Sequence, residues 1–417
     1  MIRFSNRVFL LILPIVLPLL ALVGCSRMAH TSLTPTPSST PLPPTPAPSF
    51  TPLPPAPAPT FTPLPPTLAP LSLAGGPYLQ SVTPDGVTII WETDLPLPGQ
   101  VDYGDTERYG LAATDSTPAT RHVVPLTGLK PYSLVHYRIS EGKEATVDYT
   151  FRTAAAPDQT DFKFVVFGDT RSDPIAHQNV VSSILTLAPD FVLHTGDMVA
   201  DGLVAKDWTT FFSIERKLMS QSPFYGVTGN HEHDSPIYFD VFHFPGNERW
   251  YSFDYGNIHF IGLQIDSAGG FQADSEQARW LESDLAQTRQ PWKIVFFHVP
   301  PHSSGQHGGD ERIRDALEPI LEKYQVDLVF NGHDHDYERL MTNSIVYIVT
   351  GGGGAPLYRQ VLTDPVSAYF TSTHHSVLVN VDGLQLNLAG VRADGVRFDE
   401  FTMKKASPTE PAVVVVK

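Results

Sequence analysis

Five short polar motifs, each directly following an apolar run, constrain the fold of this chain more than any other feature. The apolar runs are predicted β-strands, at residues 162–167, 191–195, 224–228, 294–297 and 326–330. The motifs that follow them are Gly168-Asp169, Gly196-Asp197, Gly229-Asn230-His231-Glu232, His298 and Gly332-His333-Asp334-His335. In an open α/β sheet, ligands bind at the carboxyl ends of the strands. We therefore expect all five motifs to converge at one edge of a sheet.

The converging side chains offer carboxylate, amide and imidazole donors and no thiolate. They are Asp169, Asp197, Asn230, His298, His333 and His335. Such donors suit divalent or trivalent ions such as iron, manganese or zinc. Six ligands are too many for one tetrahedral zinc and suit two ions that share a carboxylate. Two ions roughly 3.5–4 Å apart stabilise both the attacking and the leaving oxygen in phosphoryl hydrolysis, so the sequence predicts a two-metal hydrolytic site.

Each motif alone has a simpler explanation. A single Gly-Asp pair is usually a turn, and residues 333–335 alone could form a solvated loop. The recurrence of five such motifs, each after an apolar run, favours the metal site over these alternatives.

The pattern over residues 161–390 resembles the calcineurin-like metallophosphoesterases, and more narrowly their purple acid phosphatase branch. The resemblance is carried mainly by Gly-Asn-His-Glu at 229–232 and by Gly-His-Asp-His-Asp-Tyr-Glu-Arg at 332–339. It implies a two-sheet α/β (α+β) sandwich flanked by helices, and hydrolysis of phosphoric esters by a metal-bound hydroxide. Four amphipathic segments, at 176–187, 208–219, 275–285 and 312–324, are the predicted flanking helices.

The resemblance also assigns the ligands of the first metal. Asp197 resembles the carboxylate that bridges the two ions, and Asp169 and His335 resemble ligands of the first ion. Two positions depart from the family pattern. The Asp-x-His of many members is Asp169-Thr170-Arg171 here, and the metal-binding tyrosine of the purple branch is replaced by Ala200. The first site is then completed by water or by another residue, or is weakly occupied, and no purple colour is expected.

The second metal site matches the family without departure. Asn230, His298 and His333 resemble its ligands. His231 directly follows a ligand and resembles the general acid near the leaving group. His307 lies near the place of a phosphate-contacting histidine in the purple branch, and its alternative is a mobile surface histidine.

Three further features near these motifs have two interpretations each. Arg171 offers a fork of donors that suits phosphate oxygens, or it forms a surface salt bridge. His194 is expected to be a buried, hydrogen-bonded residue of a strand rather than a ligand. Residues 351–354, four glycines, are expected to form a close-packed turn near the site, with direct ligand contact as the alternative. No Lys-Ser/Thr follows them, so they are not a P-loop.

The N-terminus is typical of a bacterial lipoprotein signal, predicted over residues 1–24. Arg3 and Arg7 precede an apolar stretch, and Leu22-Val23-Gly24-Cys25 matches a lipobox. Cys25 is the only cysteine of the chain, which favours acylation at this position and leaves no partner for a disulfide. A plain secretory signal or a membrane-spanning anchor is the alternative. We therefore expect an extracytoplasmic protein of the cell envelope, attached to the membrane by lipid on Cys25.

Residues 25–72 are rich in Pro, Thr, Ser and Ala and predict an extended tether, with a cell-wall spacer or glycan-bearing segment as alternatives. Residues 73–156 predict short strands, at 87–91, 100–104, 122–126, 135–139 and 147–151. They resemble a small all-β fibronectin type III-like sandwich, with Trp91 as its core tryptophan and a remodelled corner near Val135 and Tyr137. We expect it to act as a spacer at the edge of the active site, with an independent binding module as the alternative. Residues 391–417 are expected to be a C-terminal strand and tail, frayed beyond Lys404.

The net charge of −16 and the lack of a basic stripe argue against nucleic-acid binding and favour a small phosphorylated substrate. The function that the sequence predicts is an extracytoplasmic, acid phosphatase-like phosphoric ester hydrolase. One alternative is a phosphodiesterase of the same fold. The other is a non-catalytic surface lipoprotein with a degenerate metal site, suggested by the residues at positions 171 and 200.

Overall fold

The structure is a computed structural model and describes residues 69–267 and 269–416. The predicted signal peptide, Cys25 and nearly all of the predicted tether lie outside the described residues. The first described strand, β1 (Ala69–Pro70), pairs with β6 (Glu144–Ala145), and the Leu71 N–H donates to the Ala145 carbonyl at 2.8 Å. The last residues predicted as tether therefore belong to the middle domain. Within the described ranges, no helix has the length and apolar character to cross a membrane.

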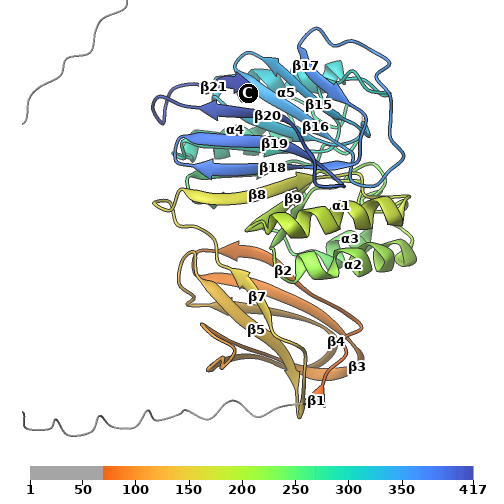
Figure 1. Ribbon diagram of the computed structural model, residues 1–417, viewed down its shortest axis with the longest axis vertical. Coiled ribbons are helices and arrows are strands. Elements are labelled where there is room, and N and C mark those ends of the chain that lie inside the picture. Colours follow the sequence, from red (N-terminus) through yellow and green to blue (C-terminus); the bar gives the residue numbers. More distant parts are fainter. Residues whose placement is uncertain (1–68, 268, 417) are drawn as a thin grey trace, which may run out of the picture. The chain divides into compact units, whose positions relative to one another are not determined.

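The middle domain, residues 69–156, is built from β-strands (Figure 1). Besides β1 and β6 they are β2 (Gly75–Thr83), β3 (Gly86–Gly104), β4 (Leu111–Thr127), β5 (Leu134–Glu141) and β7 (Tyr149–Arg152). The predicted strands at 87–91 and 100–104 are two halves of the single strand β3. The first half pairs with β2 and the second with β5, and the register with β4 shifts between them near Pro96 and Pro98. Proline lacks the N–H that a ladder needs, so the strand changes partners there. Trp91 is fully buried, as expected of a core residue.

Three buried tyrosine hydroxyls join the middle domain to the C-terminal domain, residues 161–416. Tyr137 donates to the Ser220 carbonyl at 2.8 Å, at the end of α2 (Ala205–Met219). Tyr78 donates to the Val241 carbonyl at 2.7 Å, and Tyr225 of the C-terminal domain donates to the Val82 carbonyl at 3.0 Å. The tyrosine near the predicted corner thus bonds to the neighbouring domain, and the buried apolar side chains of both domains form one continuous cluster.

The C-terminal domain contains two seven-stranded sheets within the described residues. In the first, β10 (Phe224–Gly226), β9 (Phe191–His194) and β8 (Asp161–Phe167) are parallel neighbours. Four antiparallel strands continue this sheet: β18 (His375–Asp382), β19 (Gln385–Arg392), β20 (Arg397–Lys404) and β21 (Val413–Val416). The expectation of a frayed end beyond Lys404 is wrong, because four consecutive valines pair with β20. Valine strongly favours strands, and this run extends the edge of the sheet.

The second sheet has the order β11-β12-β13-β14-β16-β15-β17. Its strands are β11 (Tyr251–Tyr255), β12 (Ile258–Gly262), β13 (Trp292–Phe296), β14 (Leu328–Asn331), β15 (Tyr337–Thr342), β16 (Ile345–Thr350) and β17 (Ser367–Thr371). Strands β12, β13, β14 and β16 are parallel, while β11 and β12 form an antiparallel hairpin. The hairpin turns at Gly256, whose φ of +57° is the left-handed conformation that glycine readily adopts.

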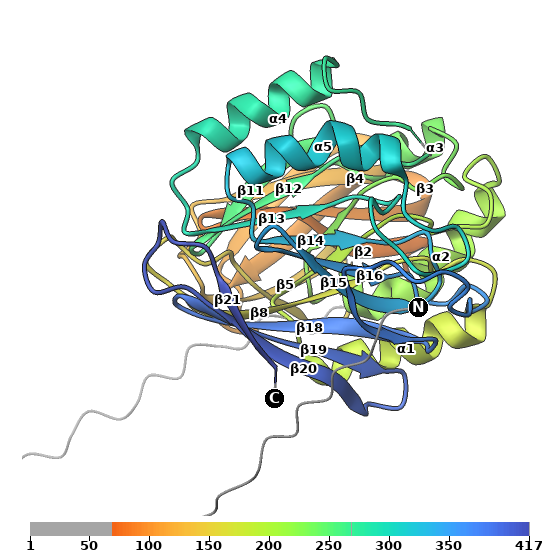
Figure 2. The ribbon, with the colours of Figure 1, turned by 90° about the horizontal axis from the view of Figure 1, so that it is seen from above.

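Helices cover the outer faces of both sheets (Figure 2). On the first sheet, α1 (Pro174–Leu187) packs against β18 and β19, and α2 lies beside α1. On the second, α4 (Glu276–Gln287) and α5 (Glu311–Lys323) share a core with the sheet. Polar side chains at the caps, Asp173, Ser275 and Asp310, start three of these helices close to the predicted positions. The short α3 (Pro236–Val241) was not predicted.

The two sheets pack face to face through aromatic side chains. Phe164 of β8 meets Phe260 of β12 edge to face, with ring centroids 5.2 Å apart, and Phe191 of β9 meets the same ring at 5.4 Å. The mixed α/β sandwich flanked by helices is the architecture that the sequence predicts.

Candidate metal centre

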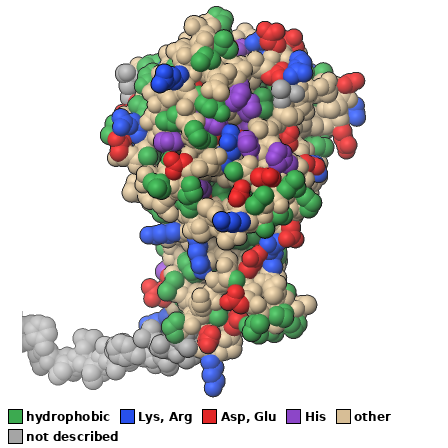
Figure 3. Space-filling view, turned by 90° about the vertical axis from the view of Figure 1, so that its right-hand side faces the viewer, with side chains coloured by type: hydrophobic (Ala, Val, Ile, Leu, Met, Phe, Trp, Pro, Cys, Tyr) green, Lys and Arg blue, Asp and Glu red, His purple; other side chains and the backbone are tan. Residues whose placement is uncertain are grey.

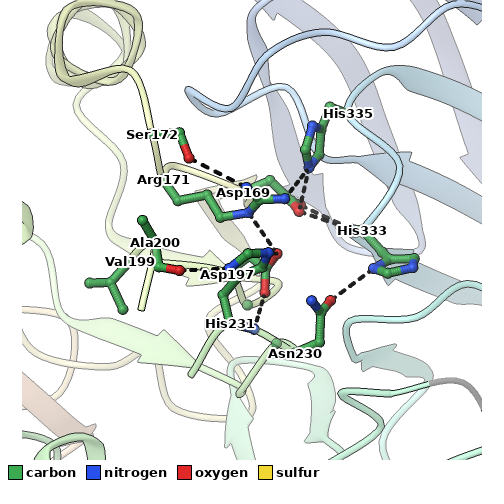
Figure 4. Close-up of polar contacts among 12 residues, drawn as sticks. Asp169, Arg171, Ser172, Asp197, Val199, Ala200, Asn230, His231, His333 and His335 are labelled. Atoms are coloured by element: carbon green, nitrogen blue, oxygen red, sulfur yellow. Dashed lines mark hydrogen bonds and ion pairs between the residues drawn. The ribbon is translucent and has the colours of Figure 1, made fainter. Parts of the chain in front are cut away.

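The five polar motifs meet at the carboxyl ends of strands from both sheets. Figure 4 shows Asp169, Asp197, Asn230 and His333 among them. In the first sheet, Asp169 follows β8, Asp197 follows β9 and Asn230 lies in the loop after β10. In the second sheet, His298 lies just after β13 and His333 after β14. The structure thus brings together the residues that the sequence predicts to converge, and it places them across the junction of the two sheets.

Three of these residues have a left-handed backbone. Asp169 and Asp197 both have a φ of +56°, and His333 has a φ of +69°. This region of φ and ψ is sparsely populated by residues other than glycine, although Asp tolerates it better than most. Strained backbone of this kind is found where the surrounding structure holds a functional side chain in place. Here it marks sharp turns directly after the strands.

Four donor atoms lie at the spacing expected around one metal ion. Oδ1 of Asn230 is 3.0 Å from Nδ1 of His333 and 3.1 Å from Nε2 of His298, and these two nitrogens are 3.3 Å apart. Oδ1 of Asp197 is 3.4 Å from Nε2 of His298. Donors about 2.0–2.2 Å from an ion lie roughly 3 Å from one another. These residues therefore fit the second metal position of the prediction.

Hydrogen bonding and burial keep the two histidines in the form that binds a metal. His298 donates from Nδ1 to the Thr195 carbonyl at 2.9 Å, which leaves a lone pair on Nε2. Burial lowers the pKa of His298. Burial also lowers the pKa of His333 to about 3, and the neighbouring His298 and His307 add to this shift. Both shifts favour the neutral form of the ring.

The donors of the first metal position face a guanidinium. Nε of Arg171 donates to Oδ2 of Asp197 at 2.9 Å, and Nη2 donates to Nε2 of His335 at 3.2 Å. His335 donates from Nδ1 to the Pro356 carbonyl at 2.7 Å, so its Nε2 is the acceptor. Burial, followed by the charge of Asp197, raises the pKa of Asp169 well above its usual value, and Arg171 opposes that shift. Arg171 is thus inside the site rather than in a surface salt bridge.

His231 lies beside the donor cluster and does not join it. Its backbone N–H donates to Oδ1 of Asp197 at 3.0 Å, and Nδ1 donates to the Ala200 carbonyl at 2.7 Å. Nε2 is 3.9 Å from Oδ2 of Asp197, and the side chain is 28% exposed. The side chain is thus partly exposed beside the donor cluster, a position compatible with the predicted role of a general acid.

Glu232 has a supporting position that the motif alone does not reveal. Its fully buried carboxylate accepts from the backbone N–H groups of Gly229 at 2.5 Å, Asp197 at 2.9 Å and Met198 at 2.8 Å. Burial, followed by the charge of Asp197, raises the pKa of Glu232 to about 8, while these three N–H groups oppose the shift. Glu232 therefore ties together the two loops that carry Asp197 and Asn230.

The four glycines form the close-packed turn that the sequence predicts. The Gly353 N–H donates to the Gly168 carbonyl at 2.8 Å. A Cβ atom at Gly351 would lie 2.2 Å from the Asp334 carbonyl oxygen, so no larger residue fits. His194 is the predicted buried strand residue: it is fully buried, bonds to Thr170 at 3.2 Å, and is not among the converging donors.

His307 lies at the rim of the site. Its ring centroid is 4.3 Å from that of His333, and Nδ1 bonds to Oδ1 of Asp334 at 3.0 Å. The bond to Asp334 raises the pKa of His307. The ring of Tyr358 lies 5.3 Å from that of His307 and stacks on His335 at 4.0 Å, contacts that no sequence pattern indicated. Histidine side chains are seen together on this face of the molecule (Figure 3).

Comparison with known proteins agrees with this geometry. Residues 162–337 match the family model of the calcineurin-like phosphoesterases. A probable purple acid phosphatase 20 of Arabidopsis thaliana is 27% identical over 318 residues, which cover 66% of this chain and 73% of the plant protein. Purple acid phosphatases imply a dinuclear metal centre, and this chain has candidate ligand residues for one.

Two solved structures share the fold. Purple acid phosphatase PPD1 from yellow lupin (Lupinus luteus) seeds has a TM-score of 0.70 at 21% identity, covering 80% of this chain and 75% of that chain. PhoD has a TM-score of 0.63 at 12% identity, covering 83% of this chain and 93% of that chain. Residues 162–337 therefore form a calcineurin-like metallophosphoesterase domain, and the chain is a phosphoester hydrolase related to the purple acid phosphatases.

Proposed function

We propose that this protein is an extracytoplasmic, metal-dependent, acid phosphatase-like hydrolase of small phosphorylated substrates. The observation that carries the proposal is the convergence of Asn230 Oδ1, His298 Nε2 and His333 Nδ1 within 3.3 Å of one another, with His231 beside them. Their chemistry suits iron, manganese or zinc. When bound, such an ion polarises a phosphoryl oxygen and lowers the pKa of a water molecule.

The side chains around the cluster supply the remaining parts of a hydrolytic site. Nε2 of His231 donates a proton to the departing oxygen. Arg171, with its five N–H donors, binds phosphoryl oxygens. His307, whose pKa is raised by its bond to Asp334, is partly exposed at the rim and offers a further N–H donor for the same oxygens.

The substrate is proposed to be a monoester, with a diester as the second candidate. A cavity of about 230 Å³ lies beside the site and is lined in part by Arg171 and Ala200. This cavity could hold the second substituent of a diester, which is why a diester is the second candidate. The net charge of −16 disfavours polyanionic substrates at long range.

The location is proposed from the N-terminal sequence. The lipobox ending at Cys25 favours attachment to the membrane by lipid, and the Pro-rich residues that follow would place the hydrolytic domain away from the surface. The middle domain is proposed to be fibronectin type III-like, as a spacer that edges the catalytic domain.

The proposal is tested with the full-length protein in detergent. Hydrolysis of p-nitrophenyl phosphate and bis-p-nitrophenyl phosphate is measured before and after removal of metal by a chelator. Turnover is expected to disappear on chelation and to return on addition of metal. Asn230→Ala should lose both the metal and the activity, whereas Asn343→Ala, at an exposed turn, should keep both. A metal-loaded protein that hydrolyses neither ester would support the surface lipoprotein with a degenerate site instead.

A further inference from the structure

We propose that the guanidinium of Arg171 takes the place of one of the two metal ions that the family implies, so that the centre holds a single ion on the Asn230 side. This inference rests on the proposed function, because it concerns the same metal site. It assigns a new role to Arg171, which lies between Asp197 of the first sheet and His335, which follows the second (Figure 4).

The hydrogen bonds of Arg171 use the lone pairs that a first ion would need. Nε donates to Oδ2 of Asp197 at 2.9 Å, and Nη2 donates to Nε2 of His335 at 3.2 Å. Because His335 already donates from Nδ1 to the Pro356 carbonyl, Nε2 carries its only free lone pair. An ion bound to these two atoms would have to displace the guanidinium.

Displacement would also bring two cations together. Arginine does not lose its proton in proteins, so a metal ion beside the guanidinium would meet a permanent positive charge. The Arg171 side chain is 15% exposed and Asp197 is 1% exposed, so water screens that repulsion poorly. The cationic side chain satisfies the electrostatic need that Asp169 and Asp197, two buried carboxyl groups, create.

Asp197 divides its two oxygens between the ion position and the arginine. Oδ1 faces Nε2 of His298, and Oδ2 accepts from Nε of Arg171. Of the groups of three or more carboxylate and imidazole donors within 4.8 Å of one another in the described residues, the one at this site contains Asp169, Asp197 and His298. His335 is not in that group, although its Nε2 lies 3.5 Å from Oδ1 of Asp169. In this arrangement the Asp197 carboxylate joins one metal ion to the Arg171 guanidinium, instead of joining two metal ions.

The backbone holds Arg171 in this position. The preceding Thr170 is buried, and its hydroxyl donates to the Met198 carbonyl at 3.0 Å. The following Asp173 donates from its backbone N–H to the Arg171 carbonyl at 3.0 Å and caps α1. The arginine thus projects from a loop that is fixed on both sides.

The test is the number of manganese ions bound by the full-length protein, measured by elemental analysis after loading with Mn²⁺ and removal of free metal. The wild-type protein should bind one ion per chain, with the electron paramagnetic resonance spectrum of an isolated ion. Arg171→His replaces the guanidinium with an imidazole, which can be neutral and can bind a metal ion through a ring nitrogen. It should double the bound manganese and give the spectrum of two coupled ions. Arg279→His, the same change at an exposed position of α4, should leave one ion bound.

Two outcomes would overturn the inference: a wild-type protein with two bound ions, or an Arg171→His protein that folds and still binds one. If Arg171→His does not fold, Arg171→Ala serves as the second variant, because it removes the charge and should also raise the bound manganese at saturating Mn²⁺. The metal count is independent of turnover. One bound ion without hydrolysis would reject the proposed function and leave this inference standing. Two bound ions with hydrolysis would reject this inference and leave the proposed function standing.

Discussion

The imidazole of His231 donates a hydrogen bond from Nδ1 to the carbonyl oxygen of Ala200 at 2.7 Å. This bond fixes which ring nitrogen faces the site, because Nδ1 carries the proton that the carbonyl accepts and Nε2 remains to exchange a proton with substrate. The contact belongs to the very position at which the purple acid phosphatase pattern has a metal-binding tyrosine. A backbone carbonyl is present whatever the side chain, so the orientation of His231 does not depend on that tyrosine.

His231→Ala should lower turnover by roughly 10²–10⁴ while leaving the metal content unchanged, as expected for loss of a general acid. The loss should be smaller for p-nitrophenyl phosphate than for an alkyl phosphate, because p-nitrophenolate needs little protonation to depart. His233→Ala, at a more exposed neighbouring histidine, is the control. Equal losses on both substrates would show that His231 is not the leaving-group acid.

Glu232→Gln should weaken metal binding and lower the free energy of unfolding by about 1–3 kcal/mol, the cost of leaving buried N–H groups without an acceptor. The amide keeps the volume but offers one acceptor oxygen in place of two. Metal titration and urea denaturation measure the two effects, with the exposed Glu276→Gln as a control for charge. Unchanged metal affinity would mean that Glu232 does not position the two ligand loops.

His259 should make stability depend on pH above neutrality. Although burial opposes protonation, bonds to Asp254 at 2.6 Å and Asp284 at 2.7 Å raise the pKa of His259 to about 9. A pKa raised in the folded state stabilises the protein fully below about pH 6.5, and this stabilisation is lost as the pH rises to 9. We expect a loss of about 2 kcal/mol across this window, allowing for the exposure of Asp254. His259→Gln should flatten the pH dependence of urea denaturation between pH 6.5 and 9, and a profile identical to wild type would contradict the assignment.

Tyr137→Phe should destabilise the protein by about 1 kcal/mol, because it removes the buried hydrogen bond from the middle domain to the Ser220 carbonyl. Tyr149→Phe makes the same change on a ring 5.4 Å away and should have a smaller effect. Thermal denaturation of the two variants gives the comparison. If both midpoints fall equally, the hydroxyl of Tyr137 does not hold the two domains together.

Cys25→Ser should release the protein from membranes without altering its turnover, because the lipid would be attached far along the chain from the hydrolytic site. Partitioning between aqueous and detergent phases, followed by assay of each, measures both properties. Retention of the variant in the detergent phase would reject the lipobox assignment.

The strand ends and most of the ligand set are predictable from the sequence because the periodicity of apolar residues and the chemistry of the donors are both local. The same reasoning places the donors of Asn230, His298 and His333 at one sheet edge, although they are far apart along the chain. Predictions fail where pairing depends on distant residues. Strand β15 was not predicted, because residues 337–342 continue a polar motif in the sequence. They form a strand because they pair with β16 on one side and β17 on the other.

Local sequence patterns also do not predict which residues surround the metal ligands. From the sequence, Arg171 is predicted to contact phosphate or to form a salt bridge. Only tertiary packing brings its guanidinium to Asp197 and His335. Tyr358 stacks on His335 from a segment without regular secondary structure, so no periodicity points to it. In the middle domain, the two predicted strands merge into β3 because a change of strand partners, rather than a turn, separates them.

The ligands of the candidate centre come from both sheets: Asp197 and Asn230 from the first, His298 and His333 from the second. An ion bound by all four residues would connect the two sheets, and the free energy of binding it would be added to that of folding. The affinity of the protein for its metal and its resistance to unfolding are then one linked quantity. In an environment poor in metal, this protein would lose cohesion between its halves along with its chemistry.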